Sequence, residues 1–120
     1  MKTSKQKAYQ YGMEAEAIVA NIISSQGFDI ICKRYHTPFG EIDIVASHGE
    51  YLVFIEVKAR NKMPEHDIVP RSKIIKICKA ADFYLLKHDL HQNTAIRFDY
   101  IALEGERIVT HLQNAWDYCV

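Results

Sequence analysis

Two short segments, Gly40-Glu-Ile-Asp at 40–43 and Glu-Val-Lys at 56–58, carry the residues whose types and spacing could do chemistry. If both segments are strands, side chains alternate between faces, and Glu56 and Lys58 project from the same face about 7 Å apart. Asp43 lies between Ile42 and Ile44, so we expect the isoleucines to face one side and Asp43 the other. Aspartate is unfavourable in mid-strand, and such a local inconsistency is typical of a functional site.

The short segment 48–50 predicts that the two strands form a hairpin. A two-residue turn centred at 48–49 or at 49–50 puts Asp43 on the face of Glu56 and Lys58. The second choice puts Asp43 directly opposite Glu56, with Cβ atoms about 5 Å apart. Two carboxylates so close repel unless a positive charge lies between them, and hard oxygen ligands suit Mg²⁺ or Mn²⁺. Lys58 could stabilise charge on a phosphate or help to activate water.

Each of the other candidate residues has two possible interpretations, a functional role and an ordinary structural one. Glu16 lies at the margin of an apolar helical stripe, where it could reach the sheet or remain in solvent. The basic residues Lys73, Lys76, Lys79 and Lys87 fall within a helical arc of roughly 120°. That arc is either a solvated face or a surface for phosphate backbones. Tyrosines such as Tyr9 could stack on unpaired bases or simply pack.

The elements that must position these residues follow from hydrophobic periodicity and turn residues. A first helix is expected at about 5–26, with Thr3 or Ser4 as N-cap and Gly27 as its stop. A second helix is expected from Pro70 to about His88, after a polar loop at 61–69. Strands are expected at 28–34, 41–47, 51–59, 96–103 and 107–112, and a short helical turn at 114–119. This order predicts an α/β fold with helices flanking a mixed sheet.

Length and composition limit the class of protein. The 120 residues predict one domain over 1–120, of which residues 1–8 could be flexible. Fifteen basic and fifteen acidic residues cancel, which disfavours a dedicated nucleic-acid binder but leaves room for clustered charge. We find no membrane-length apolar run and no signal-peptide pattern, so we expect a cytoplasmic protein without a membrane partner. The three cysteines are interpreted as reduced thiols.

The ordered set of motifs resembles a known family. Asp43 followed by Glu56-Val-Lys58 resembles the PD-(D/E)xK nuclease superfamily, the restriction-endonuclease-like fold. The fuller set resembles the YraN family, a bacterial family of uncharacterised proteins that are predicted endonucleases distantly similar to archaeal Holliday-junction resolvases. The set comprises Gly12, Glu16, Gly27, the segments 40–43 and 53–58, Val69 before Lys73, and the segment 97–99.

The resemblance implies an α-β-β-β-α-β core and roles for particular residues. Glu16, Asp43 and Glu56 would form the acidic metal site, the Val57 carbonyl would join it, and Lys58 would be the catalytic lysine. Lys73 and Arg97 match motif positions, and with Lys76 and Lys79 we name them as candidate nucleic-acid contacts. The sequence departs from the family pattern at Ala15, at Tyr35 and in the glycine-free loop 61–69.

Our hypothesis is an endonuclease that needs Mg²⁺ or Mn²⁺ and hydrolyses phosphodiester bonds in branched or otherwise structured DNA. Similarity to resolvases suggests a homodimer, because two symmetric cuts need two sites. The alternative is a non-catalytic module that binds nucleic acid or protein on the same fold. A third idea is a structural ion pair between Asp43 and Lys58.

Overall fold

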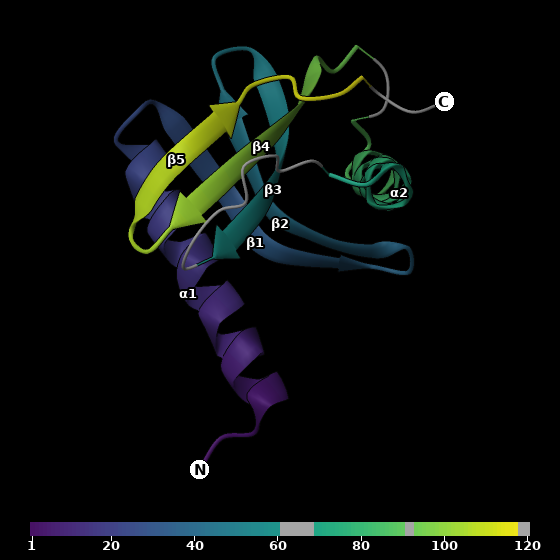
Figure 1. The fold of residues 1–120 in the computed structure, drawn as a ribbon. Coiled ribbons are helices and arrows are strands. Elements are labelled where there is room, and N and C mark those ends of the chain that lie inside the picture. Colours follow the sequence, from purple (N-terminus) through teal and green to yellow (C-terminus); the bar gives the residue numbers. More distant parts are fainter. Residues whose placement is uncertain (61–68, 91–92, 118–120) are drawn as a thin grey trace.

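A computed structural model describes residues 1–60, 69–90 and 93–117. Figure 1 shows a twisted sheet with one helix on each side. The elements in chain order are α1 (Ser4–Ser24), β1 (Phe28–Thr37), β2 (Gly40–His48), β3 (Tyr51–Arg60), α2 (Arg71–Lys87), β4 (Ile96–Glu104) and β5 (Arg107–Leu112). This confirms the predicted α/β class and the α-β-β-β-α-β core, and β5 is the final strand expected at 107–112.

The five strands lie in the sheet in the order in which they occur in the chain. β1, β2 and β3 form an antiparallel meander, and β5 is antiparallel to β4. β3 and β4 are parallel, so the chain must cross over between them, and α2 lies on this crossover, as parallel pairs require. The sheet is therefore mixed, as expected from the sequence.

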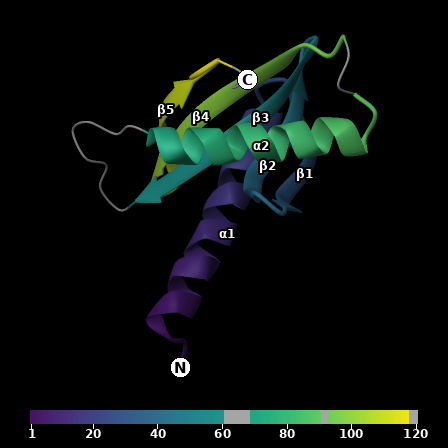
Figure 2. The ribbon, with the colours of Figure 1, turned by 90° about the vertical axis from the view of Figure 1, so that its right-hand side faces the viewer.

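Each face of the sheet has its own hydrophobic core, because each helix presents one apolar stripe. On the α1 face, Val19 and Ile23 of the helix pack with Ile44, Val53 and other strand residues. On the α2 face, the helix residues Ile77, Ala81 and Leu85 pack with Phe54 and Phe98, among others. Figure 2, turned by 90° from Figure 1, shows α2 lying across the strands.

Helix α1 is longer than the sheet it covers. Its residues are buried only from Ala15 onward, and its first part extends beyond the sheet in both views (Figures 1 and 2). A capping box holds this end, since the Gln6 amide N–H donates to Thr3 Oγ1 (3.1 Å) and the Thr3 N–H donates to Gln6 Oε1 (2.8 Å). Thr3 is therefore the N-cap, one of the two residues predicted.

The hairpin of β2 and β3 has the second of the two predicted registers. His48 pairs with Tyr51 and Ile44 with Ile55, so the turn is centred at Gly49–Glu50. Gly49 has a φ of +59°, the left-handed conformation that such turns require and glycine adopts readily.

Strand β2 does not alternate regularly, which corrects one expectation. Ile42 packs in the core of the α2 face and Ile44 in the core of the α1 face, so the two isoleucines do not share a face. The pairing of β2 with β3 ends at Ile44–Ile55. Beyond it β2 continues to pair with β1, and among the described residues it has no second strand partner there, so it is free to twist.

Two further expectations concern segments between elements. The helical turn predicted at 114–119 is wrong for 114–117, which form turns and bends, and 118–119 lie outside the described residues. Nearly all of the predicted polar loop 61–69 also lies outside them. Within the described part of the chain, neither helix is long and apolar enough to cross a membrane.

Candidate functional site

The site lies where β2 and β3 separate. A regular ladder beyond Ile44–Ile55 would bring Asp43 opposite Glu56 and Ile42 opposite Val57. Instead, the Val57 N–H donates to Asp43 Oδ2 at 2.8 Å. The aspartate side chain thus satisfies a backbone donor that has lost its strand partner, which buried donors require. This explains structurally how an aspartate is accommodated in mid-strand.

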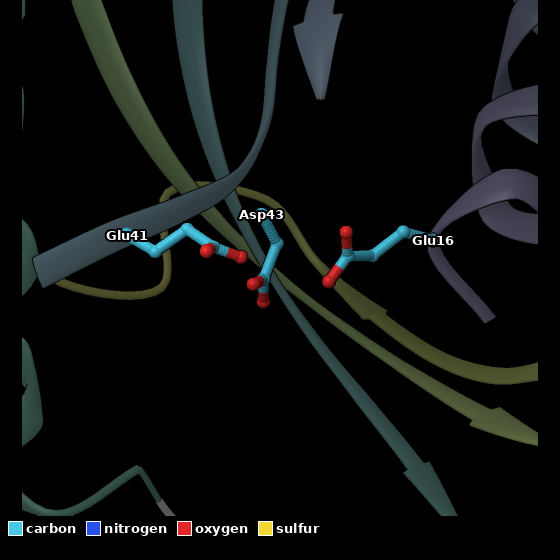
Figure 3. Close-up of side chains that lie close together, drawn as sticks. All are labelled: Glu16, Glu41 and Asp43. Atoms are coloured by element: carbon cyan, nitrogen blue, oxygen red, sulfur yellow. The ribbon is translucent and has the colours of Figure 1, made fainter. Parts of the chain in front are cut away.

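Asp43 is one of three carboxylates that converge at this point. Oxygens of Glu16, Glu41 and Asp43 all lie within 4.8 Å of one another. Figure 3 shows Glu16 reaching from α1 toward Asp43, while Glu41 approaches from β2. Glu16 is 6% exposed although its helix runs on into solvent, so its carboxylate reaches the sheet and does not remain in solvent.

Arg34 is the counter-charge on one side of this acidic group. Its Nη1 lies 3.1 Å from both carboxylate oxygens of Glu16, and its Nη2 lies 3.3 Å from Glu41 Oε1. The pairs Lys33–Ile44 and Tyr35–Ile42 place Arg34 across the ladder from Asp43. Its φ is +54°, a conformation that costs a non-glycine residue energy and often marks a functional site.

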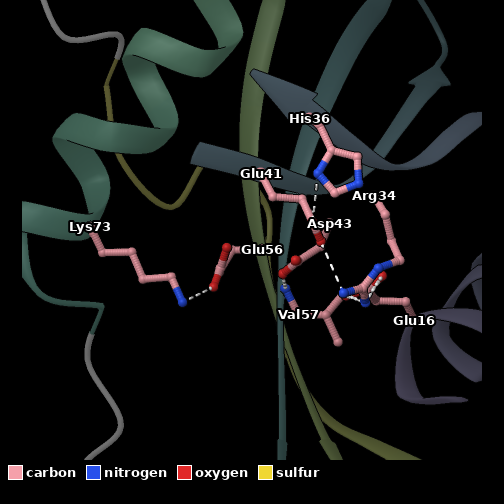
Figure 4. A network of polar contacts seen from close by, with 8 residues as sticks. All are labelled: Glu16, Arg34, His36, Glu41, Asp43, Glu56, Val57 and Lys73. Atoms are coloured by element: carbon pink, nitrogen blue, oxygen red, sulfur yellow. Dashed lines mark hydrogen bonds and ion pairs between the residues drawn. The ribbon is translucent and has the colours of Figure 1, made fainter. Parts of the chain in front are cut away.

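Glu56 lies on the other side of Asp43 and has a different counter-charge. Lys73 Nζ, from the first turn of α2, lies 2.6 Å from Glu56 Oε1. Glu56 is 5% exposed whereas the Lys73 side chain is half exposed. Figure 4 shows both halves of the network, with Lys73 at Glu56 on one side of Asp43 and Arg34 at Glu16 on the other. The ion pairs at this site therefore use Lys73 and Arg34.

The carboxyl groups hold protons more tightly than usual. Burial raises the pKa of Asp43 to about 6, with the charge of Glu16 adding to it and the Val57 N–H opposing it. Burial, followed by the charge of Asp43, raises the pKa of Glu56 to about 7 against the effect of Lys73. Burial also raises the pKa of Glu16, although Arg34 acts in the opposite direction. The site is thus short of positive charge near neutral pH.

The remaining predicted residues divide into those near this site and those elsewhere. Lys58 is half-buried on β3, two residues beyond Glu56. Val57 contributes its N–H to the site, while a role for its carbonyl stays a prediction. Lys76 and Lys79 are exposed on α2, together with Lys73, whose ammonium is held by Glu56.

Arg97, predicted as a nucleic-acid contact, is instead enclosed in a second network. It is 7% exposed, and its Nε and Nη2 donate to the two oxygens of Asp99 at 2.8 and 3.0 Å. His111 Nε2 lies 2.9 Å from Asp99 Oδ2, and the Asn114 N–H donates to Asp99 Oδ1. Although burial acts upward, the hydrogen bonds from His111 and Arg97 lower the pKa of Asp99. This network joins β4, β5 and the segment after β5.

Two residues of the acidic site were missed from the sequence. Glu41 lies in the Gly40–Asp43 motif two residues before Asp43, and equal spacing along a strand could have marked it. Arg34 carried no comparable signal, because its role depends on its own left-handed backbone within β1 and on a helix that is distant in sequence. Only the fold brings it between Glu16 and Glu41.

The fold and the site together define an α/β protein with a buried acidic group at the fork of two strands. The sequence pattern of the family described as "Uncharacterised protein family UPF0102" matches residues 15–103. A UPF0102 protein of Campylobacter fetus is 41% identical over 109 residues, covering 90% of this chain and 95% of the relative. UPF0102 proteins of Rhodopseudomonas palustris (strain BisB18) and Nitrobacter winogradskyi are each 36% identical, covering 92% of this chain and 82% and 94% of theirs. The chain belongs to the UPF0102 (YraN) family, which confirms the resemblance seen in the sequence.

Removing Arg97 tests whether it is structural. We expect Arg97→Gln to lower the free energy of unfolding by about 3–5 kcal/mol, because it leaves the Asp99 carboxylate buried without its main partner. Urea unfolding would measure this. Lys33→Gln, at an exposed position of β1, should stay within about 0.5 kcal/mol of wild type. A fully stable Arg97→Gln protein would contradict the structural role.

The raised pKa values predict how stability changes with pH in EDTA. The folded protein retains protons on Asp43 and Glu56 up to about pH 6 and 7, whereas the unfolded chain loses them near pH 4. Stability should therefore fall as pH rises from about 4 to 7. Over this pH range the free energy of unfolding of Glu56→Gln should fall by less than that of wild type, the difference being on the order of 2 kcal/mol. Unfolding measured at several pH values would test this. Parallel pH profiles for the two proteins would contradict this assignment.

Proposed function

We propose that the protein is a metal-dependent endodeoxyribonuclease that hydrolyses phosphodiester bonds in branched or otherwise structured DNA. The observation that carries the proposal is the meeting of Glu16, Glu41 and Asp43 within 4.8 Å, with Glu56 beside them. Its family relatives bear names without an activity, so the support comes from the chemistry of the site and from its likeness to the PD-(D/E)xK pattern.

The donor set fits a hard divalent cation. Carboxylate oxygens are the preferred protein ligands of Mg²⁺ and Mn²⁺. Asp43 lies between Glu16 of α1 on one side and Glu56 of β3 on the other. We expect Asp43, Glu16 and Glu41 to hold the ion, with Glu56 within reach of Asp43. A bound Mg²⁺ or Mn²⁺ would supply Lewis-acid stabilisation of the phosphate and acidify water. The raised pKa values support this, because a cation would replace the protons that the acids retain.

The chain's own cations have two roles in this proposal. Lys58, two residues beyond Glu56 on β3, is proposed to stabilise charge on the phosphate or to help orient water. Lys73 and Arg34 hold Glu56 and Glu16 in place, which fixes the orientation of the acids. Lys76 and Lys79 follow Lys73 along the exposed side of α2 and are proposed to contact the DNA backbone, a sequence-independent interaction.

Substrate structure, assembly and compartment are the finer parts of the proposal. Preference for branched DNA and a homodimer with two cutting sites rest on the likeness to junction resolvases. The cytoplasm is the proposed location, because bacterial DNA lies there.

A second candidate function is a non-catalytic module that binds nucleic acid or protein. One observation favours it: Arg34 and Lys73 already pair with the acids, so a metal is not required to neutralise them all. In this case the site would be a structural ion network, and substitutions there would change stability without any effect on DNA cleavage.

A cleavage assay decides between the two functions. Wild type should cut at least one of linear duplex, single-stranded, flap and four-way-junction DNA in Mg²⁺ or Mn²⁺ and none in EDTA. Asp43→Asn, Glu56→Gln and Lys58→Ala should each cut at least about 100-fold more slowly, because each lacks a charge-stabilising or acid–base group. Asp29→Asn, at an exposed position of β1, is the matched control and should cut normally. A folded wild type that cuts none of these substrates would favour the binding module.

Metal binding can be measured without cleavage. Mn²⁺ should raise the melting temperature of wild type in proportion to the logarithm of its concentration above the dissociation constant, and more strongly at pH 7.5 than at pH 5.5, because the acids must lose their protons. Glu16→Gln should reduce the shift. Glu14→Gln removes an exposed carboxylate from the same helix and should leave the shift unchanged. Equal shifts in both variants would remove Glu16 from the metal site.

A further inference from the structure

The first three turns of α1 form a part of the molecule that the acidic site does not account for. Every residue from Met1 to Tyr11 is exposed, and this part of the helix extends beyond the sheet (Figures 1 and 2). An isolated helical segment of this length is marginal in water. The capping box at Thr3 and the packed second half of the same helix stabilise it here.

This projecting part of α1 carries positive charge and no acidic residue. Residues 1–13 contain Lys2, Lys5 and Lys7 and no acidic residue. Since the formal net charge of the whole chain is zero, residues 14–120 carry a net charge of −3. The projecting end of α1 is therefore a second basic surface beside that of α2, and a basic surface is the pattern expected for contact with a polyanion.

One side of the projecting helix bears an open groove of about 770 Å³. Its lining comprises Lys2, Thr3, Lys5, Gln6, Tyr9, Gln10 and Met13. Tyr9 precedes Glu16 by seven residues, close to two helical turns, so the groove lies on the side of α1 that carries Glu16. Lys7 is rotated by about 200° from Lys5 and does not line the groove.

The groove also leads directly to the acidic site. The Tyr9 ring lies 4.6 Å from the guanidinium carbon of Arg34, and Arg34 in turn bonds Glu16 and Glu41. Tyr9 nevertheless remains 58% exposed, which leaves ring surface on which a base could stack. Ammonium groups for phosphates, amides for hydrogen bonds and an aromatic face for a base thus follow one another toward the carboxylates.

We propose that this groove binds the backbone of the DNA strand next to the bond that the acidic site cuts. The inference rests on the proposed function for the identity of the ligand, and it adds a binding surface on α1 to that proposal. Lys2 and Lys5 contact phosphates, and Tyr9 stacks on an unpaired base near the site. An unpaired base would occur beside a branch or a single-stranded end, so the groove favours DNA with such a junction over a continuous duplex.

The test measures binding by fluorescence anisotropy, with a labelled duplex that carries a single-stranded tail, in EDTA so that no strand is cut. We expect Lys5→Gln to weaken binding roughly threefold to tenfold at low KCl and to reduce the slope of log K against log[KCl] by about 0.7–0.9, the loss of one phosphate contact. Lys7→Gln removes the same charge from the other side of the same helix and should change the slope by much less. Glutamine maintains helix propensity in both variants.

The outcomes separate this inference from the proposed function. Equal effects of the two substitutions, or no effect of either, would overturn the groove even if wild type cuts DNA in Mg²⁺. A selective effect of Lys5→Gln in a protein that cuts no DNA would support the groove and overturn the nuclease. A wild type that does not bind the labelled DNA at all would overturn the groove.

Discussion

The site depends on one hydrogen bond, from the Val57 N–H to Asp43 Oδ2. The bond occurs where the β2–β3 ladder stops, so the aspartate takes up a donor that the next strand pair would otherwise have satisfied. An apolar side chain at position 43 would leave that donor unsatisfied. The same bond orients the carboxylate between Glu16 on α1 and Glu56 on β3, so one interaction both ends the ladder and assembles the site.

The separation of the strands is what lets two layers contribute to one site. In a continuous sheet, side chains of the α1 and α2 faces are kept apart by the backbone. Here β2 twists between Ile42 and Ile44, which pack on opposite faces, and Asp43 lies at the twist. Glu16 can therefore approach from the α1 layer, while Lys73 approaches Glu56 from the α2 layer (Figure 4). The local irregularity of the sheet is a condition of the site.

The electrostatics of the site follow from the same geometry. Four carboxylates are brought together. In the described part of the chain, Arg34 pairs with Glu16 and Glu41, and Lys73 pairs with Glu56. His36 also lies close to Glu41. Burial and mutual repulsion then raise the pKa of Asp43 and Glu56 into the physiological range. By contrast, Asp99 is satisfied by its partners and its pKa is lowered. An unsatisfied acidic group suits a site that exchanges protons for a cation, whereas a satisfied one suits a structural network.

The sequence by itself determined the element order and the hairpin of β2 and β3, because these depend on local periodicity and on a short turn. It left two registers open for that hairpin, and the ladder ends at Ile44–Ile55, before Asp43 could pair with Glu56. It also named Glu16 as a candidate, at the margin of an apolar stripe, but left open whether this carboxylate reaches the sheet or remains in solvent. Tertiary structure alone decided that Arg34 bridges Glu16 and Glu41, that Lys73 reaches Glu56 and that Arg97 is buried with Asp99. The contacts of Arg34 with Glu16 and of Lys73 with Glu56 join elements distant in the chain. The contacts of Arg34 also depend on its left-handed backbone, which no local pattern encodes. Arg97 and Asp99 are neighbours on β4, but their burial depends on residues of other strands, such as His111 on β5.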